Sequence, residues 1–135
     1  MIVERFVVLR ESDIGIAVVG VQAVARKHGF SERQIERLGT AVSELARNII
    51  RYASSKGGDI LVQQRSQSSG LELTVQARDN GPGIGNIEAA MADSFSTGGG
   101  LGLGLPGVKR MVDGFGIESV VGQGTIVTIS MLRRP

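Results

Sequence analysis

The spacing of hydrophobic residues at the start of the chain predicts a strand followed by a helix. Residues 2–9 (IVERFVVL) are rich in β-branched and aromatic side chains, which favours a strand. Ser12 or Asp13 can then cap a helix that runs to about His28, and Gly29 suits its C-terminal stop. Because this helix is apolar on most of its sides, we expect it to be buried or used at an interface.

A second helix follows, with a sharper division into apolar and polar faces. Ser31 opens it, and Gln34, three residues later, completes a capping box. The helical pattern ends near Ala53, where a loop that contains Gly57 and Gly58 begins. The apolar positions recur at three- and four-residue steps and are Ile35, Leu38, Val42, Leu45 and Ile49.

The rest of the chain predicts four strands and two more helices. The resulting order of elements indicates an α+β fold. We expect one domain over residues 1–135, with the helices on one face of a mixed, mostly antiparallel sheet. The predicted elements are strands at 59–66 and 71–78, a short helix near 87–93, a loop at 94–104, a helix from Leu105 to Phe115, and a closing hairpin of strands 117–121 and 125–132.

The composition excludes several classes of function. The 135 residues include no Cys and a single His, which excludes disulfides and zinc sites built from these residues. A net charge of +2, with no Trp and one Tyr, argues against nucleic-acid binding. The longest apolar stretch, residues 14–25, is too short to span a bilayer, and the charged N-terminus does not fit a signal peptide. We therefore expect a cytoplasmic protein that binds neither nucleic acid nor a membrane.

The polar face of the second helix carries a candidate site for magnesium and a nucleotide. Glu44 and Asn48 are four residues apart, so their side chains are neighbours on the helix surface. An Asn oxygen together with phosphate oxygens suits Mg²⁺, and a carboxylate beside it can accept a proton from an attacking hydroxyl. Arg47 and other Arg side chains nearby would stabilise phosphate charge. The alternative for this helix alone is a solvated face with Glu–Arg pairs.

Asp79 is a second candidate, because it continues the apolar register of the strand LELTVQARD. A carboxylate on the core side of a sheet needs a partner, and the amino group of a purine is a suitable donor. Gly81 and Gly83 follow in a turn that leaves space beside it. Thr125, at the start of the last predicted strand, places a hydroxyl on the core side where it could pair with Asp79. The alternatives are an Asp that caps the turn through backbone bonds and an ordinary strand-starting Thr.

A glycine-rich segment leads into the helix predicted from Leu105. Loop glycines before a helix N-terminus form a phosphate site, because free N–H groups point outward and the helix dipole favours anions. A merely flexible lid is the alternative. The candidate phosphate-binding residues are Thr97, Gly98, Gly99, Gly100, Leu101, Gly102, Leu103 and Gly104.

The ordered set of motifs resembles the Bergerat-fold (GHKL) ATPases, the group of gyrase, Hsp90, histidine kinases and MutL. The motifs that carry the resemblance are Glu44-x-x-x-Asn48, Asp79-x-Gly81-x-Gly83, the glycine-rich segment and Gly124-Thr125.

This resemblance implies a two-layer sandwich of helices on a sheet, with ATP and Mg²⁺ as ligands. It assigns Glu44 as the general base and Asn48 as the Mg²⁺ ligand. It assigns Asp79 as the partner of the adenine amino group. Gly83 and Thr125 would shape the adenine pocket, and the glycine-rich segment would line the phosphates.

Within this group the chain is similar to the anti-sigma-factor-type serine/threonine kinases, and among these to the stressosome switch kinases. The segment from Leu105 to Arg110 best distinguishes the switch kinases from the anti-sigma branch, because the anti-sigma branch lacks it. The similar segments are AVSELARNIIRYA, DNGPGI, DSFSTGGGLGLGLPGVKRMVDGF and IESVVGQGT.

The resemblance to the switch kinases implies a reaction and two partners. The γ-phosphoryl of ATP would pass to a Ser or Thr of a STAS-domain antagonist in a bacterial stress-response partner switch. A second implied role is the binding and activation of a PP2C-type phosphatase. The alternatives are an anti-sigma factor that sequesters a sigma subunit and a nucleotide-gated binding module without catalysis. Both a monomer and a homodimer fit the sequence.

Overall fold

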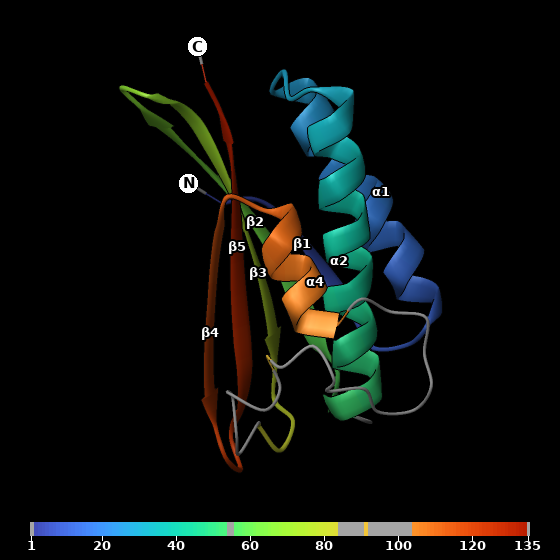
Figure 1. Ribbon diagram of the computed structural model, residues 1–135. Helices are drawn as coiled ribbons and strands as arrows, with labels where there is room; N and C mark the ends of the chain where they lie inside the picture. Colours follow the sequence, from blue (N-terminus) through green and yellow to red (C-terminus); the bar gives the residue numbers. More distant parts are fainter. Residues whose placement is uncertain (1, 54–55, 84–90, 92–103, 135) are drawn as a thin grey trace.

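The chain folds into two layers, a five-stranded sheet and helices packed on one of its faces (Figure 1). The computed structural model describes residues 2–53, 56–83, 91 and 104–134. The described elements are β1 (Ile2–Val8), α1 (Ser12–Lys27), α2 (Glu32–Ala53), β2 (Gly58–Gln67), β3 (Gly70–Asp79), α4 (Gly104–Met111), β4 (Gly114–Val120) and β5 (Gly124–Arg133).

The sheet has the strand order β1-β2-β3-β5-β4, and each of these neighbouring pairs is antiparallel. The predicted α+β class, with the helices on one face, is confirmed. The mixed sheet allowed by the prediction is wholly antiparallel in the part of the chain that the structure describes. None of the described helices is long and apolar enough to cross a bilayer.

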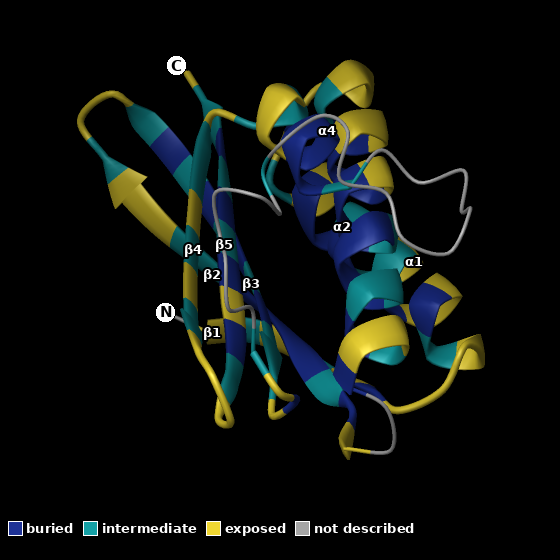
Figure 2. Cartoon of the chain, turned by 60° about the horizontal axis from the view of Figure 1, so that its bottom comes forward, coloured by how far each residue is buried: buried dark blue, intermediate teal, exposed yellow. Residues whose placement is uncertain are grey.

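Helix α2 begins with the predicted capping box. The hydroxyl of Ser31 accepts a hydrogen bond from the amide of Gln34 (3.1 Å), and the Gln34 side-chain oxygen accepts one from the amide of Ser31 (3.1 Å). The five predicted apolar positions of this helix are all buried. Figure 2 shows the buried residues gathered between α2 and the sheet, so the apolar face of this helix forms the centre of the core.

The central strand β3 has the predicted alternation. Leu71, Leu73, Val75 and Ala77 are buried beneath the helices, whereas the residues between them are only partly buried. The last residue of the strand, Asp79, is also partly buried and stands on the helix-facing side. The register of β3 therefore carries a carboxylate to the end of the core.

The C-terminal helix is shorter than the sequence predicts. The predicted helix extends to Phe115, but α4 ends at Met111, and Gly114 already belongs to β4. The amide of Asp113 donates to the carbonyl of Ser130 (3.0 Å), and its carboxylate accepts from the amide of Leu132 (2.7 Å). Because β5 satisfies these groups, the chain leaves the helix there and pairs as a strand. The short helix predicted near 87–93 lies outside the described residues except for Met91.

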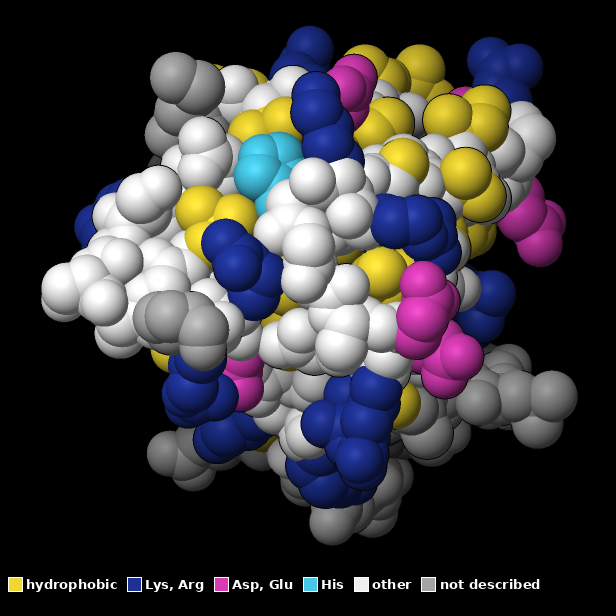
Figure 3. Space-filling view, turned by 90° about the horizontal axis from the view of Figure 1, so that it is seen from above, with side chains coloured by type: hydrophobic (Ala, Val, Ile, Leu, Met, Phe, Trp, Pro, Cys, Tyr) yellow, Lys and Arg dark blue, Asp and Glu magenta, His cyan; other side chains and the backbone are white. Residues whose placement is uncertain are grey.

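Helix α1 follows the predicted bounds closely and ends before Gly29, which has a φ of 82°. One side of the helix packs on α2 and β1, whereas Ile16 and Val19 on its other side are exposed. Figure 3 looks onto the end of the molecule where α1 leads into α2, and Lys and Arg side chains lie there in separate groups. Arg26 and Glu32 form an exposed ion pair at this junction (3.6 Å). Exposed pairs of this kind contribute little stability.

An ion-pair cluster that the sequence analysis did not predict joins three strands on the sheet face away from the helices. The guanidinium of Arg78 donates two hydrogen bonds to the carboxylate of Asp59 (2.9 and 2.8 Å). Arg5 of β1 donates a third to the same carboxylate (2.7 Å). The two hydrogen bonds from Arg78, and then the single one from Arg5, hold the pKa of Asp59 below its ordinary value despite burial, which acts in the opposite direction.

We expect this cluster to make stability depend on pH at the acidic end. Its contribution is present above the unfolded-state pKa of Asp, near 4, and is lost as the pH falls through the lower folded-state pKa. Asp59→Asn should lower the free energy of unfolding by about 1–2 kcal/mol at pH 7, since both Arg side chains are partly exposed. Urea unfolding followed by circular dichroism measures this at about pH 7, 5 and 3. The difference between wild type and variant should shrink at the lowest pH, and a constant difference would contradict the assignment.

Candidate functional site

Helix α2 holds both residues that the polar-face pattern singled out. Glu44 is 7% exposed, although it belongs to the polar face of the sequence pattern. Among the described residues, no hydrogen bond or ion pair engages its carboxylate. Asn48 is half-buried one turn further along the same helix. The alternative of a solvated face with a Glu–Arg pair is therefore wrong at Glu44.

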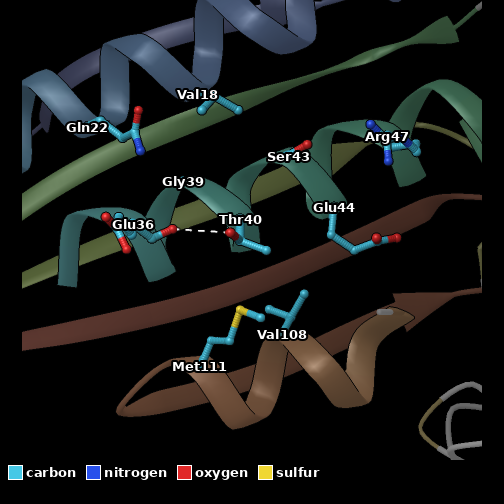
Figure 4. A pocket seen from close by; sticks show the side chains of 10 residues that line it. All are labelled: Val18, Gln22, Glu36, Gly39, Thr40, Ser43, Glu44, Arg47, Val108 and Met111. Carbon is cyan, nitrogen blue, oxygen red and sulfur yellow. Dashed lines mark hydrogen bonds between the residues drawn. The ribbon is translucent and has the colours of Figure 1, made fainter. Parts of the chain in front are cut away.

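Glu44 lines a groove that α2 shares with α1 and α4, and its side chain leaves α2 on the side that faces α4 (Figure 4). The groove has a volume of about 580 Å³. Arg47, a predicted phosphate-binding residue, is half-buried in its wall. The described residues that line the groove are Val18, Gln22, Glu36, Gly39, Thr40, Ser43, Glu44, Arg47, Val108 and Met111.

Asp79 lies in a row of paired residues that crosses four strands. It stands opposite Gly58 of β2 and opposite Thr125 of β5, and Thr125 in turn stands opposite Ser119 of β4. The carboxylate of Asp79 accepts a hydrogen bond from the amide of Gly81 (2.8 Å). The turn-capping geometry considered for Asp79 is therefore present, and it fixes the orientation of the carboxylate at the end of the core.

The turn after Asp79 packs against the C-terminal end of α2. A Cβ atom at Gly81 would lie 2.8 Å from the Cα of Ala53, so only glycine allows this approach. Gly83 has a φ of 79° and lies close to the backbone of Val120. Since Ala53 belongs to the helix that carries Glu44, the two predicted parts of the site both lie along α2.

Thr125 is buried and faces the core side of the sheet, as predicted. It stands directly opposite Asp79, but its hydroxyl forms a hydrogen bond with the hydroxyl of Ser119 (2.9 Å). Ser119 was missed by the sequence analysis, because only the β4–β5 register reveals it as a neighbour of Thr125. The signal available in the sequence was its place in the alternation of strand 117–121.

The predicted phosphate-binding segment is described only at its end. Gly104 is the first residue of α4 and has a φ of 67°, a conformation that side chains rarely adopt. The remaining candidates lie outside the described residues, so their role stays a prediction. They are Thr97, Gly98, Gly99, Gly100, Leu101, Gly102 and Leu103.

Comparison with known proteins adds family relationships to this geometry. Residues 33–135 match the family described as histidine kinase-, DNA gyrase B-, and HSP90-like ATPase. The chain is 46% identical over 127 residues to the serine/threonine-protein kinase RsbT of Bacillus subtilis (strain 168), which covers 93% of this chain and 94% of that protein. It is 34% identical over 114 residues to an anti-sigma F factor of Thermoanaerobacter sp. (strain X514). This match covers 82% of this chain and 78% of that protein.

Solved structures support the same fold. A mycobacterial sensor histidine kinase, MprB, matches with a TM-score of 0.59 at 20% identity and covers 98% of both chains. The RsbU and RsbW domains of a Mycobacterium tuberculosis protein match with a TM-score of 0.60 at 19% identity, over 98% of this chain and 33% of that one. At these identities the likeness concerns the arrangement of the elements.

Near Asp79, we expect two glycines with positive φ to differ in how much an Ala substitution destabilises the fold. Gly122→Ala should lower the free energy of unfolding by about 1 kcal/mol, since its φ of 83° is strained for Ala but no atom lies within 4 Å of the added Cβ. Gly124→Ala should cost at least about 3 kcal/mol, because its Cβ would collide with the carbonyl oxygen of Asp79. Urea unfolding of both variants tests this, and equal losses would show that the close approach at Gly124 is unimportant.

Proposed function

The chain belongs to the histidine kinase-, DNA gyrase B- and HSP90-like ATPases, and from this premise we propose that it is a serine/threonine protein kinase that uses ATP to phosphorylate a STAS-domain protein. The observation that carries the proposal is Glu44, a carboxylate that is 7% exposed and has no hydrogen-bonding partner among the described residues. A carboxylate in the wall of a groove can accept the proton of a hydroxyl that enters the groove, which fits the role of general base.

The nucleotide lies, in this proposal, along α2 with its adenine at the Asp79 end. Asp79 accepts a hydrogen bond from the adenine amino group while Gly81 continues to orient the carboxylate. Gly83 and Thr125 shape the same pocket. About nine residues separate Ala53, beside this pocket, from Glu44, a span of about 13 Å along the helix axis. The triphosphate would extend along this span toward Asn48.

The phosphates are held by polar groups of α2 and the glycine-rich segment. Asn48 presents an amide oxygen one turn after Glu44, which fits a magnesium ligand because Mg²⁺ prefers oxygen ligands and keeps several waters. When bound, Mg²⁺ neutralises charge on the phosphate oxygens. Arg47 adds a positive charge near them. Backbone N–H groups of the segment from Thr97 to Gly104 bind the phosphates in the same proposal.

The transfer step uses Glu44 as the base. Glu44 accepts the proton of a Ser or Thr hydroxyl as that oxygen bonds to the γ-phosphorus. The bond between the γ-phosphorus and the bridging oxygen breaks, and ADP leaves with the electron pair. The products are the phosphorylated side chain, ADP and a protonated Glu44, which returns its proton to water.

The proposal also concerns the identity of the protein substrate and of the other partners. RsbT, at 46% identity, is named as a serine/threonine-protein kinase, and this supports a protein substrate for this chain. We extend that likeness to a partner switch in the cytoplasm. In this switch a STAS-domain antagonist is the substrate and a PP2C-type phosphatase is the second partner. The 34% identity to anti-sigma F factors supports a second candidate, a kinase that also sequesters a sigma subunit. Stable co-purification with a sigma factor would favour this second role.

Glu44→Gln tests the proposed base. With labelled ATP, Mg²⁺ and a STAS-domain protein encoded in the same genome, the wild type should transfer label, and the variant should be slower by about 10²–10⁴-fold. Gln keeps the size of the side chain, so ATP affinity measured by calorimetry should change little. Transfer by the variant at the wild-type rate, or no transfer by the wild type, would overturn the proposal.

Asp79→Asn tests the proposed adenine contact. The variant should bind ATP more weakly by about 1–3 kcal/mol, the value of a hydrogen bond to a charged group. The wild type should prefer ATP over GTP, because GTP carries an oxygen where adenine carries the amino group. Titration calorimetry with both nucleotides measures this. Equal affinity of the wild type for ATP and GTP would contradict the assignment.

A further inference from the structure

The groove beside Glu44 extends away from the nucleotide end of α2. Its described walls come from three helices, and those on α2 reach from Glu36 to Arg47. Asp79 and Gly81 lie at the opposite, C-terminal end of the same helix, next to Ala53. Glu44 therefore separates the proposed nucleotide site from most of the groove.

In-line transfer fixes the side from which the acceptor must come. The attacking oxygen and the leaving oxygen lie on opposite sides of the transferred phosphorus. In the nucleotide position proposed above, ADP leaves toward the Asp79 end of α2, so an in-line acceptor hydroxyl would approach from the N-terminal side of Glu44. The groove is the hollow on that side, and Glu44, 7% exposed and without a partner among the described residues, lines it at the end nearer the proposed nucleotide (Figure 4).

We propose that this groove between α1, α2 and α4 binds the Ser- or Thr-bearing segment of the protein substrate, an inference that rests on the proposed kinase function. The lining fits a short polypeptide segment, which needs both apolar contacts and hydrogen-bonding groups. Val18 of α1 and Val108 and Met111 of α4 supply apolar surface. Polar groups come mostly from α2 and include Thr40 and Ser43. A volume of about 580 Å³ accommodates a few residues, not a folded domain.

Thr40 is the position at which the groove can be blocked without touching the base. It is exposed, lies one turn before Glu44 and donates its hydroxyl to the carbonyl of Glu36 (3.2 Å). Thr40→Tyr adds volume inside the groove on a surface position, so the fold should tolerate it. Arg33→Tyr is the matched control, because Arg33 is exposed on the same helix and is not among the residues that line the groove.

The experiment measures substrate and nucleotide binding separately. The probe is a STAS-domain protein from the same genome, titrated into each variant with a non-hydrolysable ATP analogue and assayed for phosphorylation with ATP. Thr40→Tyr should raise the Kd and KM for the STAS-domain protein by at least about tenfold, with ATP affinity and thermal unfolding as in the wild type. Arg33→Tyr should match the wild type in all four measurements.

Three results separate this inference from the kinase proposal. Unchanged binding of the STAS-domain protein by Thr40→Tyr would overturn the groove assignment while the kinase proposal stands. The groove assignment would also be overturned if Thr40→Tyr lost as much affinity for ATP as for the STAS-domain protein, since the groove would then hold the nucleotide. A wild type that binds the STAS-domain protein but transfers no phosphate would overturn the kinase proposal, and the groove would be judged on the change in Kd alone. A wild type that does not bind it contradicts both.

Discussion

The packing of helix α2 on the sheet is the interaction on which the site depends. The apolar face of α2, with Leu38, Leu45 and Ile49, is fully buried and sets the position of the helix above β2, β3 and β5. Burial of this kind contributes roughly 1.5–3 kcal/mol for each large side chain, so the helix has little freedom to move. The same packing holds Glu44 and Asn48 at the edge of the core.

Glycines adjust the distance between this helix and the turn that follows Asp79. Gly81 allows the turn to reach the end of α2, and Gly124 allows β5 to start beside the backbone of Asp79. A larger residue at either place would push apart the two halves of the candidate site. Close backbone approach, more than side-chain contact, therefore determines how near Asp79 comes to the helix that carries the proposed base.

Regular patterns made much of the fold predictable. The capping box of Ser31 and Gln34 and the apolar stripe of α2 were confirmed because both depend on residues within a few positions of one another. The predicted end of the last helix was wrong, since the chain around Asp113 bonds to β5, which lies far along the sequence. The cluster of Asp59 with Arg5 and Arg78 escaped prediction for the same reason. It exists only because three strands pair in one register.

The sequence by itself determined which residues are candidates for the site. Glu44 and Asn48 share a helix face by their spacing, and Asp79 continues the apolar side of its strand, because both periodicities follow from backbone geometry alone. Only the tertiary structure decided their surroundings: that Glu44 is buried, that it lines a groove made by α1, α2 and α4, and that the hydroxyl of Thr125 pairs with Ser119. These properties depend on which elements pack together, and that is set by contacts between segments far apart in the chain.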